Sequence, residues 1–131
     1  MPQADIEGLR AGYEAISRGD FERPFRDVNP DFELTTPPGI NAGTYRGREE
    51  CQAYLDDMTT ALETWTVEPE EFFESGDQIV VFVKIRARPK GSSAEIEIRN
   101  GHLWRLRDGK PLSMRFFPAP EQALEAAGLR E

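Results

Sequence analysis

Cysteine and histidine are the scarcest reactive residues of this 131-residue chain, which contains one of each. The single cysteine, Cys51, excludes an intramolecular disulfide. One cysteine, one histidine and dispersed carboxylates give no ligand spacing typical of a metal site, and a serine or cysteine triad has no spare histidine. We therefore predict no metal. Cys51 lies on the apolar face of a predicted helix, where we expect a buried and unreactive thiol.

Long apolar runs and basic clusters are also missing. No run reaches the roughly 18 apolar residues that a membrane-spanning helix needs, and the first ten residues, MPQADIEGLR, contain no signal-peptide core. The net charge is −8, with arginine and lysine scattered along the chain, so nucleic acid and anionic membrane surfaces would be repelled. These features predict a cytoplasmic protein without a nucleic-acid or membrane partner.

Glycine does not follow a nucleotide-binding pattern. Gly39, Gly43 and Gly47 match neither a phosphate-binding loop nor a dinucleotide fingerprint, and we predict no cofactor. At this length the chain is expected to form a single domain, residues 1–131, with a substantial core.

The stretch from Ala94 to Pro118 has the clearest pattern in the sequence. Apolar residues alternate with charged ones, which predicts a strand, and Asp108-Gly109 predicts a tight hairpin turn before a returning strand. One parity of this pair contains Ile96, Ile98, Asn100, His102, Trp104 and Leu106, and then Leu112, Met114 and Phe116. The only histidine therefore lies in an apolar row.

Other segments alternate between helix and strand patterns. Helical periodicity covers residues 3–18 and 48–62, a shorter helix follows Asp20, and a terminal helix covers 121–127. Strands are expected at 31–36, at 65–73 with Pro69 marking an edge or bulge, and at 78–88. The loop after Pro37, which includes Tyr45, is either a lid over a pocket or a solvent-exposed connector.

This order predicts an α+β fold, in which a curved antiparallel sheet is wrapped by three N-terminal helices and followed by a short C-terminal helix. Such a sheet would enclose a cone-shaped cavity suited to a ligand. Residues 79–86 are apolar on both faces, which suggests a second subunit on the outer face.

Motifs along nearly the whole chain are similar to those of the nuclear transport factor 2-like superfamily, in particular its SnoaL-like branch. The residues that carry the resemblance are Tyr13-Glu14-Ala15 before Arg18-Gly19-Asp20-Phe21, Asn29-Pro30-Asp31-Phe32, Tyr45-Arg46-Gly47-Arg48-Glu49, Ser75-Gly76-Asp77, the block from His102 to Lys110, and the block from Ala123 to Leu129. The resemblance implies a cone fold and a homodimer that packs through the outer sheet face. The superfamily includes ketosteroid isomerases, polyketide cyclases, dehydratases and epoxide hydrolases, so it implies no single activity.

The catalytic residues of these enzymes are not reproduced. The isomerase base matches Thr36, which cannot abstract a carbon-bound proton, and the oxyanion tyrosine would fall near Gly12 rather than on Tyr13. The second oxyanion donor matches His102. An Asp-Arg-Asp set of the hydrolase kind is missing, and the cyclase acid is replaced around Phe117.

His102 is the best functional candidate, because an imidazole can serve as acid, base or hydrogen-bond donor. The alternative is a core histidine bonded to a tyrosine or to backbone. Tyr13 and Asn100 are its candidate partners in catalysis, with core packing as the alternative for Tyr13. We expect the ligand pocket to include Glu33, Tyr54, Ile98, Trp104, Met114 and Phe116, although Glu33 could instead face solvent.

Three functions remain open at this point. The first is a cofactor-free enzyme, of isomerase, cyclase, dehydratase or hydrolase type, for a small apolar carbonyl or polyketide-like compound. The second is a non-catalytic module that binds a small hydrophobic molecule. The third is a dimeric interaction domain with a vestigial pocket.

Overall fold

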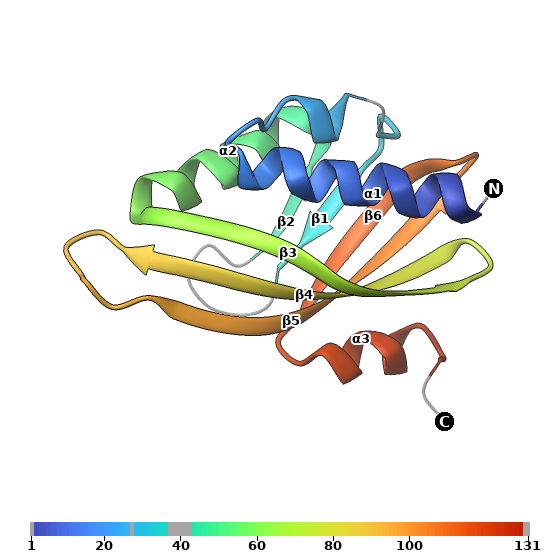
Figure 1. Ribbon diagram of the computed structural model, residues 1–131. Helices are drawn as coiled ribbons and strands as arrows, with labels where there is room; N and C mark the ends of the chain where they lie inside the picture. Colours follow the sequence, from blue (N-terminus) through green and yellow to red (C-terminus); the bar gives the residue numbers. More distant parts are fainter. Residues whose placement is uncertain (1, 27, 37–42, 130–131) are drawn as a thin grey trace.

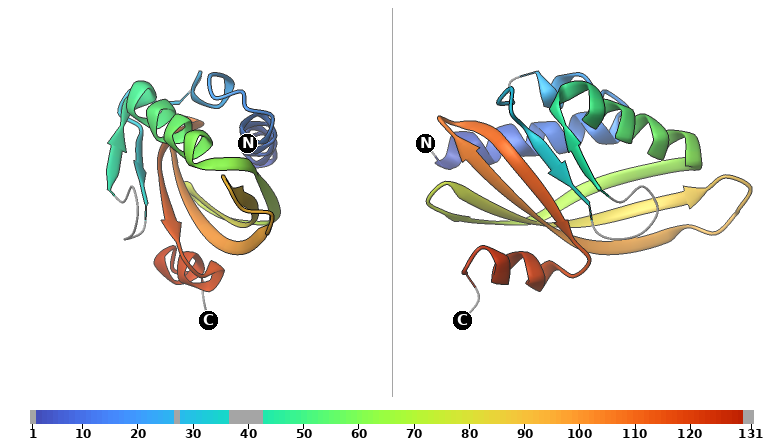
Figure 2. Two further views of the ribbon diagram at one scale, coloured as in Figure 1. Left: turned by 90° about the vertical axis from the view of Figure 1, so that its left-hand side faces the viewer. Right: turned by 180° about the vertical axis from the view of Figure 1, so that it is seen from behind.

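The computed structural model of the protein describes residues 2–26, 28–36 and 43–129. Its central element is a curved six-stranded sheet (Figure 1). Its strand order is β2-β1-β6-β5-β4-β3. The longest strands, β3 (Leu62–Ser75), β4 (Gln78–Pro89) and β5 (Ile96–Arg107), form an antiparallel meander with β6 (Lys110–Phe117). Figure 2 shows in its left view how this sheet curves beneath the helices on its concave side. The α+β prediction is confirmed.

The β5–β6 hairpin forms as the sequence predicts. Asp108 and Gly109 both adopt positive φ angles, 54° and 77°, which a two-residue turn of this type requires. The register shifts by one residue between Leu106, paired with Pro111, and Arg105, paired with Ser113. Beyond this bulge His102 lies opposite Phe116 and Trp104 opposite Met114. Side chains of directly paired residues share one face, so the register brings these four residues to the same face of the sheet.

Strand β3 lies at one edge of the sheet, as the proline within it indicates. Pro69 is paired with Val83 and Glu71 with Phe82, so the register shifts between Pro69 and Glu71. Pro69 therefore stands at an edge strand and at a bulge, the two settings in which a strand tolerates a residue without an N–H donor.

The other end of the sheet differs from the prediction in two ways. Strand β1 (Glu33–Thr35) pairs parallel with β6, so the sheet is mixed and not antiparallel throughout. Residues Thr44–Arg46, predicted to be loop, form strand β2, which pairs antiparallel with β1. Both pairings link segments whose partner is chosen by the tertiary fold, which local alternation does not reveal. Residues 37–42 of the predicted loop lie outside the described residues.

The prediction of three N-terminal helices is wrong. Only α1 (Pro2–Ser17) is an N-terminal α-helix, because the segment after Asp20 forms a single 3₁₀ turn, η1 (Arg23–Phe25). The third predicted helix, α2 (Gly47–Ala61), follows β1 and β2 along the chain. Figure 1 shows α1 and α2 together on one side of the sheet, above the meander. They cover the concave face and close the cone from above.

Helix α3 (Pro120–Ala126) packs on the opposite, convex face of the sheet (Figure 1). Ala123 is fully buried there with Val80 and Leu103. The contact is close at Gly101, where an added Cβ would lie 2.8 Å from the Cβ of Ala123 and 2.9 Å from the backbone of Pro120. The apolar outer face of β4 that the sequence shows is therefore partly covered by the chain's own last helix.

Candidate functional site

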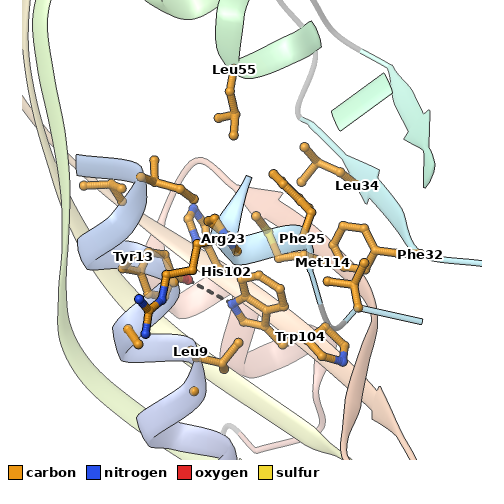
Figure 3. Close-up of a pocket in the computed structure, with 18 of the residues that line it drawn as sticks. Leu9, Tyr13, Arg23, Phe25, Phe32, Leu34, Leu55, His102, Trp104 and Met114 are labelled. Carbon is orange, nitrogen blue, oxygen red and sulfur yellow. Dashed lines mark hydrogen bonds between the residues drawn. The ribbon is translucent and has the colours of Figure 1, made fainter. Parts of the chain in front are cut away.

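A cavity of about 670 Å³ lies between the concave face of the sheet and the helices above it. Its wall is mainly aliphatic and aromatic, with contributions from α1, η1, β1, α2 and every strand of the meander. Figure 3 shows these side chains converging from the different elements, with Leu9 and Tyr13 on α1 and Leu55 on α2. This size and lining are typical of sites for small organic molecules.

Three polar side chains form a hydrogen-bonded network in this apolar wall. The hydroxyl oxygen of Tyr13 lies 2.7 Å from Nδ1 of His102, and the indole N–H of Trp104 donates to the same hydroxyl oxygen at 2.8 Å. The three residues come from α1 and from two inward positions of β5. The sequence separations are 89 and 91 residues, so only the tertiary fold brings the network together.

Aromatic contacts hold the imidazole in place. The His102 ring stacks on Phe116 with 4.3 Å between ring centroids, and the Trp104 ring meets Tyr13 edge-on at 6.1 Å. His102 is 2% exposed and Tyr13 is 4% exposed. Rings packed in this way have few alternative rotamers, so the polar atoms of the network stay in fixed positions.

Burial determines the charge state of the network. Desolvation lowers the pKa of His102 to about 3, so the imidazole is neutral at physiological pH. Burial also raises the pKa of the Tyr13 hydroxyl above its usual value, an effect that the hydrogen bond from Trp104 opposes only in part. Both groups are therefore neutral hydrogen-bonding groups, and neither is a strong acid or base.

The network contains one more proton than its hydrogen bonds can use. The indole N–H, the phenol O–H and the neutral imidazole N–H supply three protons, whereas the network has two hydrogen bonds. If Tyr13 donates to Nδ1, the spare proton is on Nε2 of His102, which is buried and has no partner among the described residues. If Nδ1–H donates to Tyr13 instead, the phenol O–H is spare. In either tautomer one buried donor remains for another molecule.

Four other predicted pocket residues also line the cavity, namely Tyr54, Trp104, Met114 and Phe116. Tyr54 projects from α2 and meets Phe116 edge-on at 6.5 Å between centroids. Burial raises the pKa of Tyr54 to about 12, so its hydroxyl stays protonated. The other three, Trp104, Met114 and Phe116, come from the row of shared parity on β5 and β6.

Two residues of the same parity lie elsewhere. Ile98 is 48% exposed and is not part of the cavity wall, so its assignment to the pocket is wrong. It is paired with Ile85 near the free end of the β4–β5 hairpin. Asn100 also lies outside the wall, and its amide, oriented to satisfy its hydrogen bonds, donates to the carbonyl of Pro118 at 3.2 Å. It therefore ties β5 to the chain before α3 and does not contact His102.

Glu33 is not in the cavity either. Its carboxylate is paired with the guanidinium of Arg46 at 3.1 Å, and Leu34 takes the inward position of β1. Tyr45 belongs to β2 and packs against Tyr54 with 4.8 Å between ring centroids. The exposed Arg115 stacks its guanidinium over Phe117, away from the cavity, as its outer parity predicts.

Several wall residues were not singled out from the sequence. Trp65 and Leu55 line the cavity, and their apolar periodicity indicated burial without distinguishing core from cavity. Arg23 also lines it, from η1, and nothing in the sequence separates this arginine from the others. The carboxylates that line the cavity within the described residues, Asp5 and Asp108, come from the first turns of α1 and from the β5–β6 turn.

Metal binding and thiol chemistry have no support in the described part of the chain. It contains no group of three or more histidine, cysteine, aspartate or glutamate residues that could hold a metal ion. Cys51 is fully buried, as predicted, and desolvation raises the pKa of its thiol to about 12. Among the described residues, no helix is long and apolar enough to cross a membrane.

The model of the SnoaL-like domain family matches residues 9–113, which is most of the chain and includes the polar network. The protein belongs to the SnoaL-like domain family. The resemblance noted in the sequence is thereby confirmed. No curated protein matches the chain significantly.

Solved structures similar to this SnoaL-like domain include an NTF2-like protein of unknown function from Burkholderia pseudomallei. It is 25% identical, with a TM-score of 0.80, over 92% of this chain and 95% of that one. TerC, co-crystallised with polyporic acid, is 27% identical with the same TM-score and the same coverage of both chains. A protein of ketosteroid isomerase-like fold from Catenulispora acidiphila, in complex with trimethylamine, is 17% identical with a TM-score of 0.77 over 95% and 94%, and shows the fold alone.

Proposed function

We propose that this SnoaL-like domain binds a small, flat and largely apolar molecule that carries a carbonyl or similar hydrogen-bond acceptor. The observation that carries the proposal is the spare proton of the Tyr13–His102–Trp104 network, buried in the wall of an apolar cavity. An unmade hydrogen bond of a buried donor costs about 1–3 kcal/mol, and a ligand acceptor that meets this donor recovers much of that cost. The domain should therefore bind a ligand with a hydrogen-bond acceptor more tightly than one of the same shape without it.

The size and lining of the cavity support the same class of ligand. Aromatic rings in the cavity wall, such as Trp104 and Tyr54, favour a planar apolar body. TerC, the 27% identical protein of the same fold, was crystallised with an organic acid, polyporic acid. A polyketide-like or quinone-like carbonyl compound would satisfy both the apolar wall and the buried donor.

Cofactor-free catalysis on such a compound is the second candidate function. When the hydroxyl oxygen of Tyr13 accepts hydrogen bonds from both Trp104 and His102, its own O–H is polarised and left to donate to the ligand. A donor of this kind stabilises an oxyanion as it forms, which isomerisation, cyclisation, dehydration and hydrolysis all require at a carbonyl. A neutral His102 with a pKa of about 3 is a poor proton acceptor at neutral pH, so its role in this candidate is that of a positioning residue and hydrogen-bond partner.

The experiment compares two ligands that differ in one carbonyl group, 1-tetralone and tetralin. Calorimetric titration should give the ketone an affinity about tenfold higher, the upper range of one hydrogen bond. The ¹⁵N resonances of the single histidine need no assignment, and they should shift with the ketone but not with the hydrocarbon. Equal affinities without a shift would contradict the buried-donor proposal.

Two matched variants locate the binding site. Leu55→Trp fills the cavity from α2 and should abolish binding of both compounds. Ile98→Trp adds the same ring at an exposed position outside the wall and should leave both affinities unchanged. Circular dichroism of both variants controls for folding. Binding that survives Leu55→Trp would place the ligand elsewhere.

Homodimerisation through the convex sheet face is part of the proposal. The half-buried Phe73 and Phe82 pack there in a tilted arrangement with 4.9 Å between ring centroids, beside the area that α3 covers. A second copy would cover apolar surface that α3 leaves open.

A further inference from the structure

Arg23 is an exposed arginine at the cavity that has no acidic partner within the described residues. Several other arginines are paired with a carboxylate, among them Arg26 with Glu22, Arg46 with Glu33, and Arg99 with Glu70. Figure 3 draws the Arg23 side chain reaching from η1 towards α1. Its guanidinium therefore stands at the cavity with its five N–H donors available.

The backbone of η1 fixes where this side chain starts. The carboxylate of Asp20 accepts hydrogen bonds from the backbone N–H groups of Glu22 and Arg23, each at 3.2 Å, and these bonds lower the pKa of Asp20. The next residue, Pro24, has a restricted φ angle and packs against α1 at Gly12. Phe25 is buried in the core. The backbone of Arg23 is thus fixed on both sides, by the hydrogen bonds to Asp20 before it and by the packing of Pro24 and Phe25 after it. Its side chain therefore starts from a defined position at the cavity.

Charge around the cavity differs from that of the whole molecule. The chain has a net charge of −8, yet the charged residues that line the cavity, counted over the described part of the chain, are three cations and two anions: Arg23, Arg26, Lys110, Asp5 and Asp108. The excess of one positive charge is small, but it favours a negatively charged group at the cavity. The rest of this acidic protein disfavours such a group. A guanidinium is also the side chain whose fork matches a carboxylate.

We propose that Arg23 is a specificity-determining residue that selects an anionic ligand. The apolar body of the ligand enters the cavity, and its carboxylate, or an acidic enol or phenol in ionised form, pairs with the guanidinium. This inference rests on the proposed function, since it assumes that the cavity binds a small molecule. It adds a second anchor, separate from the buried donor of the Tyr13–His102–Trp104 network.

The test uses two fluorescent probes of one scaffold. 8-Anilinonaphthalene-1-sulfonate carries an anionic group, and N-phenyl-1-naphthylamine is the same aromatic body without it. Arg23→Gln should weaken binding of the sulfonate about fivefold at low salt, the range of one exposed ion pair, and leave binding of the neutral probe unchanged. Added salt should weaken sulfonate binding to wild type and have little effect on its binding to Arg23→Gln.

Arg26→Gln is the matched control, because it removes the same charge from the same wall at a residue already paired with Glu22. It should change sulfonate affinity less than twofold. Equal losses in both variants, or no loss in Arg23→Gln, would overturn the proposal. A neutral probe that binds wild type and is lost in Leu55→Trp shows that the cavity binds small molecules, so failure of the Arg23 inference and failure of the proposed function are distinguishable.

Discussion

Burial gives the single histidine chemistry that its residue type alone does not indicate. An imidazole in water changes charge near neutral pH, whereas His102 stays neutral because burial of its ring disfavours the charged form. The hydrogen bond from or to Tyr13 is compatible with either neutral tautomer. At the scale of the residue, the site is therefore a set of neutral donors and acceptors.

The first prediction concerns pH. Below pH 6.5 the unfolded chain binds a proton at His102, whereas the folded chain does so only near pH 3, so stability falls as pH falls through this window. The slope is about 1.4 kcal/mol per pH unit for one such group. Between pH 7 and pH 5, the free energy of unfolding measured with urea should thus fall by about 2 kcal/mol more for wild type than for His102→Phe.

Subtracting the His102→Phe curve removes the contributions of the carboxylates, which are common to both proteins. The ring resonances of His102 provide a second measurement, and they should show no titration step between pH 9 and pH 4. If the free energies of unfolding of wild type and His102→Phe changed equally with pH, and the ring titrated near pH 6.5, the imidazole would be hydrated and the prediction wrong.

The second prediction concerns the Tyr13 hydroxyl. Tyr13→Phe removes the acceptor of the Trp104 N–H and the partner of Nδ1 of His102, while the ring and its packing remain. The free energy of unfolding should fall by about 2–3 kcal/mol, since buried polar groups lose their partners. Tyr45→Phe is the control, because it removes a phenol hydroxyl from a neighbour of Tyr54 outside the network. A loss below about 0.5 kcal/mol for Tyr13→Phe would contradict the network.

At the scale of the elements, the contact between β5 and α3 joins the two faces of the sheet. Gly101 precedes His102 along β5, so its missing side chain leaves room for α3 on the convex face while His102 points to the cavity. A glycine in a strand interior often marks such a close approach. The position of the C-terminal helix and that of the cavity wall are therefore set by adjacent residues.

Replacing this glycine tests the contact. In Gly101→Ala the new methyl group meets Ala123 and the backbone of Pro120 at less than 3 Å, so α3 must move, at a cost of about 1–3 kcal/mol. Gly8→Ala is the matched control on α1, where nothing lies within 4 Å of the new Cβ. It should raise stability by up to about 1 kcal/mol through helix propensity. Both values come from urea unfolding, and equal effects would contradict the close contact.

The elements also show where sequence reasoning succeeds and where it stops. Alternation along β5 separates the two faces of the strand but does not show how far along the strand the cavity extends. Ile98 shares the parity of Trp104 and yet is 48% exposed and outside the cavity wall. Asn100 is diverted by a partner eighteen residues away, Pro118.

The pairing of β1 illustrates a second limit. Its three residues join β2 on one side and β6 on the other, and neither partner is specified by local pattern. Once these pairings form, Leu34 faces the cavity and Glu33 faces Arg46. Local periodicity indicates the longer helices and strands, whereas contacts over long sequence distances required the fold itself.

At the scale of the whole molecule, the two faces of the sheet have different roles. The concave face and its helices enclose the cavity, and the convex face contains α3 beside half-buried aromatic side chains. A sheet with apolar side chains on both faces needs cover on both. The helix supplies part of that cover, and the proposed second copy would supply the rest.

Sedimentation velocity tests the assembly. We expect a species of twice the 14.8 kDa chain mass, because the open part of the convex face is apolar around Phe73 and Phe82. Phe82→Lys should shift the equilibrium towards monomer, whereas Ile96→Lys, at an exposed position of the β4–β5 hairpin, should not. A wild-type protein that sediments as a monomer at micromolar concentration would exclude this dimer.

The opposite placement of α1 and α3 also decides how the protein can be attached to a surface. The first turns of α1 contribute Asp5 and Gly8 to the cavity wall, whereas α3 lies behind the sheet. Biotin coupled beyond α3 would therefore lie on the face of the sheet opposite the cavity, whereas the same label ahead of α1 would lie close to residues of the cavity wall. Sensor chips for a fragment screen should carry the protein by its C-terminal side.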